Sequence, residues 1–462
     1  MNKRISFVTK RMFTFVLILS AAFAVTAQSK KEKKQAAMLQ QQADSSYIAK
    51  DYRSAADLYA QSLALVPNNN YGHYKKGFAH YNLQEYDKAV DEFTTALGQG
   101  YSPIDVYRIR SFVYFDKKDW DNALGDIQKG LALAPRDVGF LKMLGEINLS
   151  RNALSDALDA YKRAAEAAPN DADIFYNIAR VYFALGDVQQ QGIAAEAALS
   201  KGTRFPAEAH YLLANAYHRQ KRADEAIAEY QRAISSKPEM YDAYRNLADV
   251  YRSEARYDDA IKISKQALLK FPQDGNIYTD LSWYYSLANR PDDAVQAGRA
   301  AVTFLPKQAL GYTNLCRAYN DTKEYQLAIN TCNAALGLSP GDGESYFYLA
   351  RAYDLLNKPG EATKYYKLAV PGLETFASGN PDYSDGWYLL GNAYFADKQL
   401  DKAVEAYRQC LVLSPRFANA RFNLGVVYVK QNNKAAAVEQ YSALRPLDPA
   451  SAEDLKALID KL

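Results

Sequence analysis

Histidine and cysteine, the residues that most often carry catalysis or bind metals, are scarce in this sequence. It has four His and three Cys among 462 residues. No HExxH, GxSxG or P-loop motif occurs, and no pair of cysteines has the spacing of a zinc site. We therefore predict no catalytic residue, no metal site and no cofactor, and the sequence argues against an enzyme.

The N-terminus has the pattern of a signal peptide. An apolar run of about 14 residues ends at Val25, is preceded by Lys3, Arg4, Lys10 and Arg11, and is followed shortly by Ala27. The run is shorter than the roughly 20 residues that span a bilayer. We predict a signal peptide over residues 1–27, cleaved after Ala27, with an uncleaved anchor as the alternative.

Removal of that segment takes away four of the 56 basic residues and none of the 53 acidic ones, which leaves a net charge of −1. A near-neutral chain offers no field that attracts nucleic acid, so we expect no nucleic-acid partner and no membrane span after cleavage. The predicted location is export to the periplasm or outer membrane of a bacterium, or secretion.

Tyrosine, by contrast, is abundant, with 37 copies, and it recurs at a fixed interval. The stretch "AYRNLADVY" begins at Ala243, and similar stretches begin at 277, 311, 345 and 386. The first three steps are 34 residues and the last is 41. A fixed period of this length is the mark of a repeat array.

One unit, numbered from Tyr241 as position 1, contains two apolar stripes with helical spacing. Tyr244, Ala248 and Tyr251 occupy positions 4, 8 and 11, and Ala260 and Ala267 occupy positions 20 and 27. A short polar segment separates the stripes, and a proline ends the second one. Each unit is therefore predicted to be two antiparallel helices, with small residues at positions 8 and 20 that let the helices approach closely.

This pattern resembles the tetratricopeptide repeat (TPR), a 34-residue helix–turn–helix unit with bulky residues at positions 4, 11 and 24 and small ones at 8, 20 and 27. The resemblance covers nearly all of the chain after the leader. It implies an all-α fold: an α-solenoid of about twelve units, wound as a right-handed superhelix. The first helix of each pair would line its concave face.

The predicted organisation is a TPR superhelix over residues 28–451 and a capping helix over 452–462. Three places depart from the pattern. The first unit is weak, as expected of a terminal repeat. The unit near 172–206 has Gln191 where Ala is expected at position 20. About seven extra residues lie near 371–385, a stretch that we predict as a loop from its Pro, Gly and Asn content.

The resemblance also places positions 5, 9 and 12 of the first helices on the concave face, and Asn recurs at position 6 of these helices. An Asn side chain has the donor and acceptor of a peptide bond, and Arg and aromatic residues are common anchors of bound peptides. We predict a peptide-binding groove that includes Asn177, Arg180, Tyr211, Asn215, Arg245, Asn246, Asp249, Trp283, Asn314, Arg317 and Arg351. Packing of aromatic rings such as Trp283 against neighbouring units is an equal alternative for each ring.

Some TPR proteins bind acidic C-terminal tails through a carboxylate clamp. Asn215 and Asn246 match its two asparagines, but Tyr211 stands where the clamp has Lys. The clamp is incomplete, so this sequence does not predict recognition of an acidic tail.

The cysteines allow two interpretations. Cys316, Cys332 and Cys410 occupy positions 8, 24 and 27, which are packing positions, so all three are expected as small buried residues. Positions 8 and 24 lie opposite each other across a helix pair. In an exported chain a Cys316–Cys332 bridge is the other interpretation, and it would leave Cys410 unpaired.

We predict a non-catalytic scaffold that binds a peptide segment or partner protein of an envelope or secretion assembly in its concave groove. The alternative is a periplasmic module for polysaccharide export, since aromatic rings also stack on sugars. A third interpretation is a structural homo-oligomer with an exposed apolar end face. Solvent-facing rings would favour a sugar, and Asn paired with Arg would favour a peptide.

Overall fold

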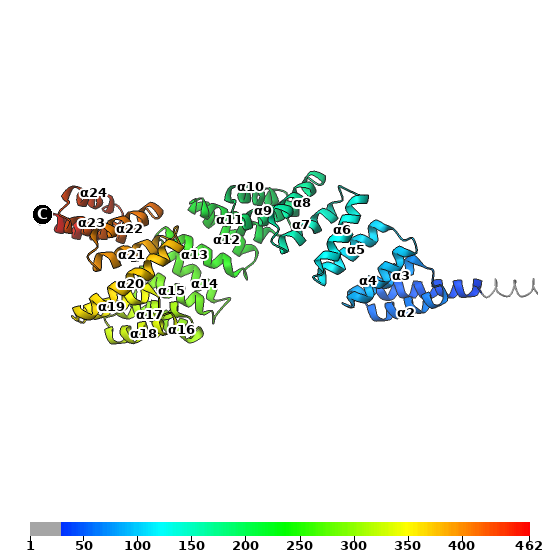
Figure 1. Ribbon diagram of the computed structural model, residues 1–462, viewed down its shortest axis with the longest axis horizontal. Coiled ribbons are helices and arrows are strands. Elements are labelled where there is room, and N and C mark those ends of the chain that lie inside the picture. Colours follow the sequence, from blue (N-terminus) through cyan, green and yellow to red (C-terminus); the bar gives the residue numbers. More distant parts are fainter. Residues whose placement is uncertain (1–28) are drawn as a thin grey trace, which may run out of the picture. The chain divides into compact units, whose positions relative to one another are not determined.

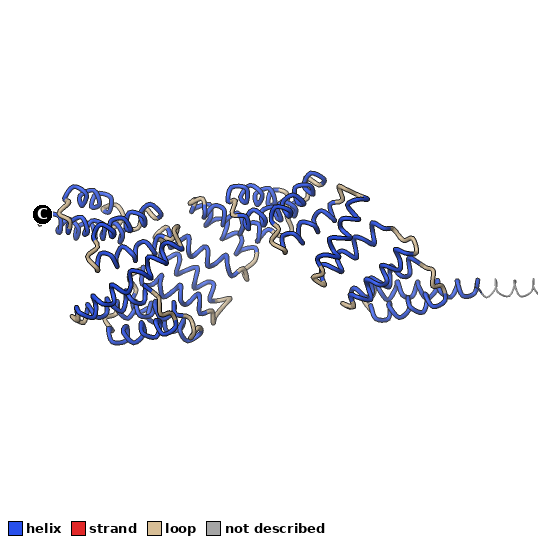
Figure 2. The backbone as a smooth tube through the Cα atoms, in the orientation of Figure 1, coloured by secondary structure: helices blue, strands red, loops and turns tan. Residues whose placement is uncertain are grey.

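The computed structural model describes residues 29–462, so the predicted signal peptide lies outside the described residues. Within this part of the chain every regular element is a helix and no strand is present (Figures 1 and 2). By internal contacts the chain divides into two compact units, which we call unit 1 (up to Arg204) and unit 2 (Phe205–Leu462).

Unit 1 begins with a helical segment over residues 29–48. The helices that follow it are α2 (Tyr52–Leu65), α3 (Asn70–Asn82), α4 (Tyr86–Gly98), α5 (Pro103–Asp116), α6 (Trp120–Leu133), α7 (Val138–Ser150), α8 (Leu154–Ala167), α9 (Ala172–Leu185) and α10 (Val188–Ser200).

Unit 2 contains fifteen labelled helices in the same alternation. They are α11 (Pro206–Arg219), α12 (Ala223–Ser236), α13 (Tyr241–Ser253), α14 (Tyr257–Leu268), α15 (Gly275–Leu287), α16 (Pro291–Phe304), α17 (Ala309–Asp321), α18 (Tyr325–Leu338), α19 (Gly343–Leu355), α20 (Pro359–Gly379), α21 (Ser384–Ala396), α22 (Leu400–Leu413), α23 (Ala418–Lys430), α24 (Lys434–Leu444) and α25 (Pro449–Ile459).

The turn inside each helix pair follows one backbone rule. A single residue with positive φ stands between the two helices, for example Lys118 (φ 60°), Ala255 (φ 57°) and Asn289 (φ 55°). The next amide then donates back to a carbonyl of the preceding helix, as Arg256 does to Tyr251 at 2.8 Å. This left-handed ending satisfies the last carbonyls of the first helix and reverses the chain.

The close approach of the two helices that was predicted at the small residues of positions 8 and 20 is confirmed. Gly77 and Gly145, at position 8 of their units, lie against the rings of Phe93 and Tyr161 at position 24. A Cβ atom on Gly145 would stand 2.6 Å from the Tyr161 ring, so only glycine fits there without displacement. The alanines at position 20, which mark the start of each second helix, are at most 2% exposed. They are Ala55, Ala89, Ala123, Ala157, Ala226, Ala260, Ala294, Ala328, Ala362, Ala403 and Ala437.

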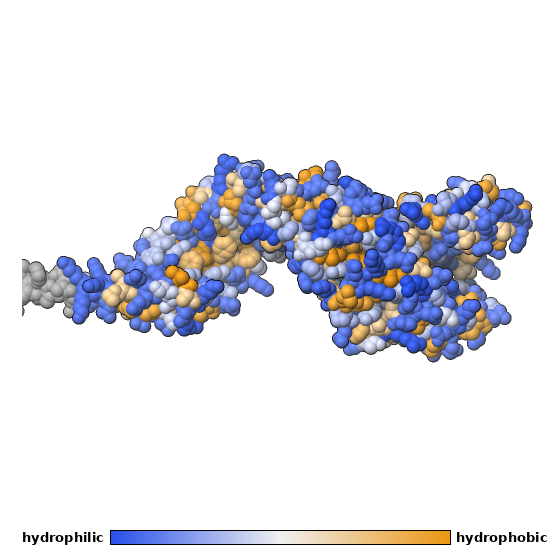
Figure 3. Space-filling model, turned by 180° about the vertical axis from the view of Figure 1, so that it is seen from behind, coloured by the Kyte–Doolittle hydropathy of each residue, from blue (hydrophilic) through white to orange (hydrophobic). Residues whose placement is uncertain are grey.

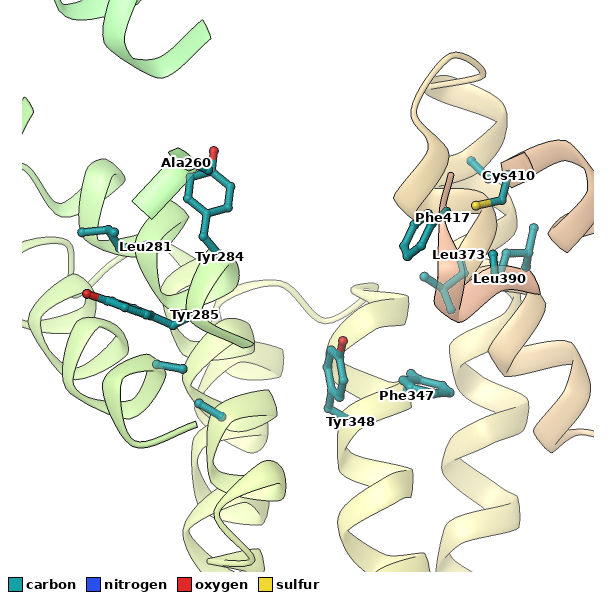
Figure 4. Close-up of a cluster of buried hydrophobic side chains, with 14 of the residues drawn as sticks. Ala260, Leu281, Tyr284, Tyr285, Phe347, Tyr348, Leu373, Leu390, Cys410 and Phe417 are labelled. Atoms are coloured by element: carbon teal, nitrogen blue, oxygen red, sulfur yellow. The ribbon is translucent and has the colours of Figure 1, made fainter. Parts of the chain in front are cut away.

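The hydrophobic interior differs between the units. In unit 1 separate small clusters form around Tyr59, Phe93 and Ile127. In unit 2 one cluster continues from Ala214 to Ile459. Figure 4 shows members of this cluster, including Tyr285, Phe347 and Leu390. In unit 2 five of the seven tyrosines at position 11 are buried in this core, at 4–7% exposure, and they are Tyr251, Tyr285, Tyr319, Tyr394 and Tyr428. The other two, Tyr217 and Tyr353, are half-buried against it.

Cys316 and Cys332 form a disulfide between α17 and α18, with their Cα atoms 5.4 Å apart. The bond takes the place of the contact between small and large residues that other units make at positions 8 and 24. Cys410 is buried and unpaired, as expected if the bridge forms.

The loop predicted near 371–385 is wrong for most of its length. Helix α20 continues through Pro371 to Gly379, and only residues 380–383 separate it from α21. Pro371 lacks the amide that would bond inside the helix, but the extra turns are held by a close crossing with the start of α19. A Cβ on Gly372 would lie 2.6 Å from the nitrogen of Gly343, so two glycines meet where the helices cross.

The other two departures from the repeat pattern are helical. The first unit's weak helix is formed over residues 29–48. Gln191 is fully buried inside α10, so the degenerate unit keeps its helix pair. The boundary between units 1 and 2 falls at Arg204, where that degenerate unit ends.

At the C-terminus α25 begins three residues before the predicted 452 and ends at Ile459. Leu455 and Ile459 are buried, and Leu455 packs on Gly425 of α23. Among the described residues no helix combines the length and apolar character needed to cross a bilayer. On the face seen in Figure 3 apolar residues form small patches between hydrophilic ones.

Candidate functional site

Unit 2 contains a cavity of about 530 Å³ that is lined by residues of α13, α15, α17, the start of α19, α20 and α21. We call it the α13–α21 cavity. Six of the predicted groove residues line it: Arg245, Asn246, Asp249, Trp283, Asn314 and Arg317. Its size is in the range of pockets that hold a small molecule or a few side chains.

The extra turns of α20 build the second wall of this cavity. Leu373 and Phe376 from these turns line it, followed by Asn380 and Tyr383 from the connection to α21. Sequence reasoning found the insertion but missed these residues, because Pro371 and the following glycines were interpreted as a loop. The spacing of Leu373, Phe376 and Ala377 is helical, and this pattern predicts that α20 continues and can form the second wall of the cavity.

An ion pair between Arg252 and Asp385 links α13 to α21 across 133 positions of sequence, and Asp385 lines the cavity. Both side chains are 6% exposed. Asp249 also accepts from Arg252, at 2.7 Å. Burial disfavours the charged guanidinium, but Asp385 and Asp249 outweigh it and hold the pKa of Arg252 well above its ordinary value. Burial raises the pKa of the Asp385 carboxyl, against the opposing effect of Arg252.

Arg245 and Asp280, which both line the cavity, form a second ion pair with a nitrogen–oxygen distance of 2.9 Å. Burial raises the pKa of Asp280, and Arg245 opposes that shift. The Arg245 guanidinium is therefore already neutralised by a carboxylate of the neighbouring unit. Asn246, beside it, donates to the Tyr211 hydroxyl at 3.1 Å.

Arg317 and Asn314 are bonded to each other inside the cavity wall. The Asn314 oxygen accepts from Arg317 at 2.6 Å, and the Asn314 amide donates to the carbonyl of Thr279. Arg317 is 8% exposed, and Glu344 lies 4.0 Å away, beyond hydrogen-bond distance. Burial raises the pKa of Glu344 to about 7.

A second and more open cavity, of about 990 Å³, lies between α15 and α23. We call it the α15–α23 cavity. Arg317 lines both cavities, and Arg351 lines only this one, paired with Asp321 at 3.3 Å. Tyr348 contributes its hydroxyl, to which Arg317 donates at 3.3 Å. Figure 4 shows Tyr348 beside Phe347 on α19.

The remaining predicted residues lie elsewhere. Asn177 and Arg180 belong to unit 1, where Arg180 donates to Asn177 and to Glu146, both at 2.9 Å. Tyr211 and Asn215 are half-buried on α11 and line neither cavity. The structure thus brings six of the eleven predicted residues around the α13–α21 cavity.

Comparison with known families agrees with this architecture. Models described as "TPR repeat" match residues 145–186 and 391–432, and models described as "Tetratricopeptide repeat" match 217–282, 41–102 and 176–241. This chain is a multi-TPR protein. After residue 41 the matches leave residues 103–144, 283–390 and 433–462 uncovered, and the second of these stretches contains the disulfide and the lengthened α20.

Two curated proteins resemble short parts of this TPR chain. One is a UDP-N-acetylglucosamine–peptide N-acetylglucosaminyltransferase of Giardia intestinalis, 33% identical over 82 residues, which is 18% of this chain and 6% of that protein. The other is Protein bimA of Emericella nidulans, 32% identical over 73 residues, 16% of this chain and 9% of that protein. The chain thus matches less than a tenth of either relative's length.

Similar solved structures include the Cut9–Hcn1 hetero-tetramer of APC/C (16% identity, TM-score 0.37, 92% of this chain and 96% of that one). Yeast Tom70 is 14% identical with a TM-score of 0.41, covering 93% and 96%. A TPR protein from Parabacteroides merdae is 14% identical with a TM-score of 0.39, covering 55% and 98%.

The TPR fold points to protein partners, since stacked helix pairs present an extended concave binding surface. Within residues 29–462 no group of three or more His, Cys, Asp or Glu is arranged to hold a metal ion.

Proposed function

We propose that this TPR protein is an exported, non-catalytic scaffold whose unit 2 holds a peptide segment of a partner from an envelope or secretion assembly. The observation that carries the proposal is the α13–α21 cavity, because six predicted groove residues meet there beside a second opening at Arg317. Export is supported by the leader at residues 1–27 and by the Cys316–Cys332 bridge, since disulfides persist in oxidising compartments.

A peptide is favoured over a polysaccharide by the state of the aromatic rings. The guanidinium of Arg252 lies 5.0 Å from the centre of the Trp283 ring and that of Arg317 lies 5.9 Å away. Trp283 is thus engaged by the protein's own cations and is not a free platform for a sugar. Asn314 is paired with Arg317, the combination that favours a peptide.

The test is site-specific photocrosslinking in cells, with a photoreactive residue in place of Asn246 in unit 2. The matched control carries it at Asn177, the same repeat position in unit 1. A defined protein should crosslink at 246, and Arg245→Glu should abolish it by breaking the pair with Asp280. Crosslinking to polysaccharide, or equal yields at both positions, would contradict the proposal.

Export has a separate test. The N-terminal sequence of the protein purified from its native cell should begin at Gln28 and the protein should fractionate with the envelope. An intact Met1 in the cytoplasmic fraction would remove the envelope part of the proposal and leave the scaffold part standing.

A further inference from the structure

The charges around the α13–α21 cavity do not balance. Two guanidinium groups line it, those of Arg245 and Arg317. The carboxylates that line it are more numerous: Asp242, Asp249, Asp280, Asp342, Glu344 and Asp385. Counting Arg252, which is held by Asp249 and Asp385 at the edge of the cavity, three cations face six carboxylates.

The lining arginines are engaged within the protein. Arg245 is paired with Asp280 at 2.9 Å, and Arg317 donates to Asn314 and Tyr348. A ligand carboxylate entering the cavity would have to displace these partners and would meet the remaining carboxylates at close range. The cavity is therefore unfavourable for an anion.

One carboxylate has only a distant ion-pair partner. Glu344 stands in the first turn of α19, and its side chain is 21% exposed. Its nearest cation, Arg317, is 4.0 Å away. Asp342 and Asp385 raise its pKa further by repulsion, so a cation placed beside Glu344 would relieve three negative charges at once.

The cavity wall also offers apolar surface to the stem of a cationic side chain. Trp283 and Tyr383 are already contacted by the Arg252 guanidinium, at 5.0 Å and 5.2 Å from the ring centres. Leu373 and Phe376 line the cavity as well and supply the apolar surface. Since no metal-binding group exists among the described residues, an organic cation fits better than a metal ion.

A buried donor of Arg317 indicates that the bound cation belongs to a peptide. The Nε of Arg317 is buried with no acceptor within the described residues. Arg317 lines the cavity, so a carbonyl oxygen of a bound peptide is a candidate acceptor for this donor.

We propose that the α13–α21 cavity binds an organic cation, the guanidinium or ammonium of an Arg or Lys side chain on a partner peptide, with Glu344 as its counter-ion. This inference rests on the proposed function, since it names the chemistry of the segment that the scaffold holds. A free amine or guanidine of small-molecule origin shares this chemistry, so the test separates the two sources.

The experiment is isothermal titration of the signal-free chain, residues 28–462, with matched probes. The peptides are Ac-Ala-Ala-Arg-Ala-Ala-amide and the same peptide with citrulline, which keeps the shape and removes the charge. Agmatine represents the free cation. We expect the arginine peptide to bind at least tenfold more tightly than both the citrulline peptide and agmatine, and Glu344→Gln to abolish the preference over citrulline.

The control variant is Glu361→Gln on the exposed first turn of α20, which should leave all affinities unchanged. Circular dichroism of each variant checks the fold, and Glu344→Asp should restore part of the preference. Equal binding of arginine and citrulline peptides would overturn the inference and leave the scaffold proposal intact. Agmatine binding as tightly as the arginine peptide would keep the cation site and overturn the peptide source. Absence of binding by every cationic probe would overturn the inference.

Discussion

Units 1 and 2 are built from the same 34-residue repeat, yet they pair charges over different sequence distances. In unit 1 Arg180 contacts Glu146, which lies 34 positions away, and the two side chains are 33% and 34% exposed. In unit 2 Arg252 contacts Asp385, 133 positions away, with both side chains 6% exposed. Stacking brings together residues about one period apart; a lengthened helix was needed to bring together residues four units apart.

The difference between the two units shows how part of the open face of a solenoid can become enclosed. Successive repeats contact mainly their neighbours, so their concave face is open. In unit 2 the extra turns of α20 cross the start of α19 at Gly343 and Gly372 and bring Leu373 and Tyr383 over the first helices of earlier pairs. One insertion thereby turned part of an open face into the α13–α21 cavity.

The largest expected effect tests this closure. Arg252→Ala leaves Asp385 buried without a cation, which should cost about 3–5 kcal/mol of stability. The matched change in unit 1, Arg180→Ala, should cost about 1 kcal/mol or less because that pair is partly solvated. Chemical denaturation with hydrogen exchange would assign each loss to its unit. Equal losses of stability in Arg252→Ala and Arg180→Ala would show that the buried pair of unit 2 contributes no more than the partly solvated pair of unit 1.

The second prediction concerns the disulfide of unit 2. Replacing Cys316 and Cys332 by Ser opens a loop of 16 residues, which should cost about 3 kcal/mol. Hydrogen exchange should increase in α17 and α18 and stay unchanged in unit 1. Cys410→Ser, a change at an unpaired cysteine, is the control, and a variant pair no less stable than this control would refute the prediction.

The third prediction uses the pKa of Glu344, about 7 in the folded protein against an ordinary value of 4.5. The folded state holds this proton more tightly than the unfolded state, so the group lowers stability as pH rises from about 4.5 to 7. We expect Glu344→Gln to remove about 2–3 kcal/mol of this pH dependence. Denaturation midpoints at pH 5 and pH 8 measure it.

Glu361→Gln is the control for this comparison, because that side chain is 50% exposed. Its midpoints should follow those of the unchanged protein at both pH values. An unaltered pH dependence in Glu344→Gln would show that Glu344 is ionised at neutral pH at no cost.

The smallest effect is expected where the two units are alike. Ala255→Gly in unit 2 and Lys118→Gly in unit 1 both replace an exposed residue with positive φ, 57° and 60°. Each should stabilise its unit by about 0.5–1 kcal/mol, because glycine adopts this conformation without strain. Thermal denaturation would measure both, and a loss of stability in either would show that its side chain contributes more than the strain costs.

Much of the fold was predictable because the repeat multiplies weak local signals. The alanines at position 20 and the rings at position 24 recur in register, and each reports the same close contact between two helices. The contact between positions 8 and 24 even placed Cys316 opposite Cys332. The positive-φ turn residue was not predicted, since it is Lys, Asn or Ala more often than glycine.

The candidate site was predictable only in part. Repeat position identified Arg245, Trp283 and Arg317 as concave-face residues, because position alone fixes the side of a helix. It did not reveal that Arg245 is neutralised by Asp280 or that Arg317 is buried beside Asn314. Those partners come from neighbouring units, and their pairing depends on how closely the first helices pack.

The helix pairs, their period and the small residues at which they touch can be read from the sequence, because they depend on contacts within about one repeat length. The enclosure of the α13–α21 cavity and its excess of carboxylates arise only when the helices pack in three dimensions. Asp385 meets Arg252 only after the three intervening units have stacked and α20 has continued past Pro371. A periodic sequence specifies each step of a solenoid, whereas a contact across several units depends on the accumulated geometry of all the steps between.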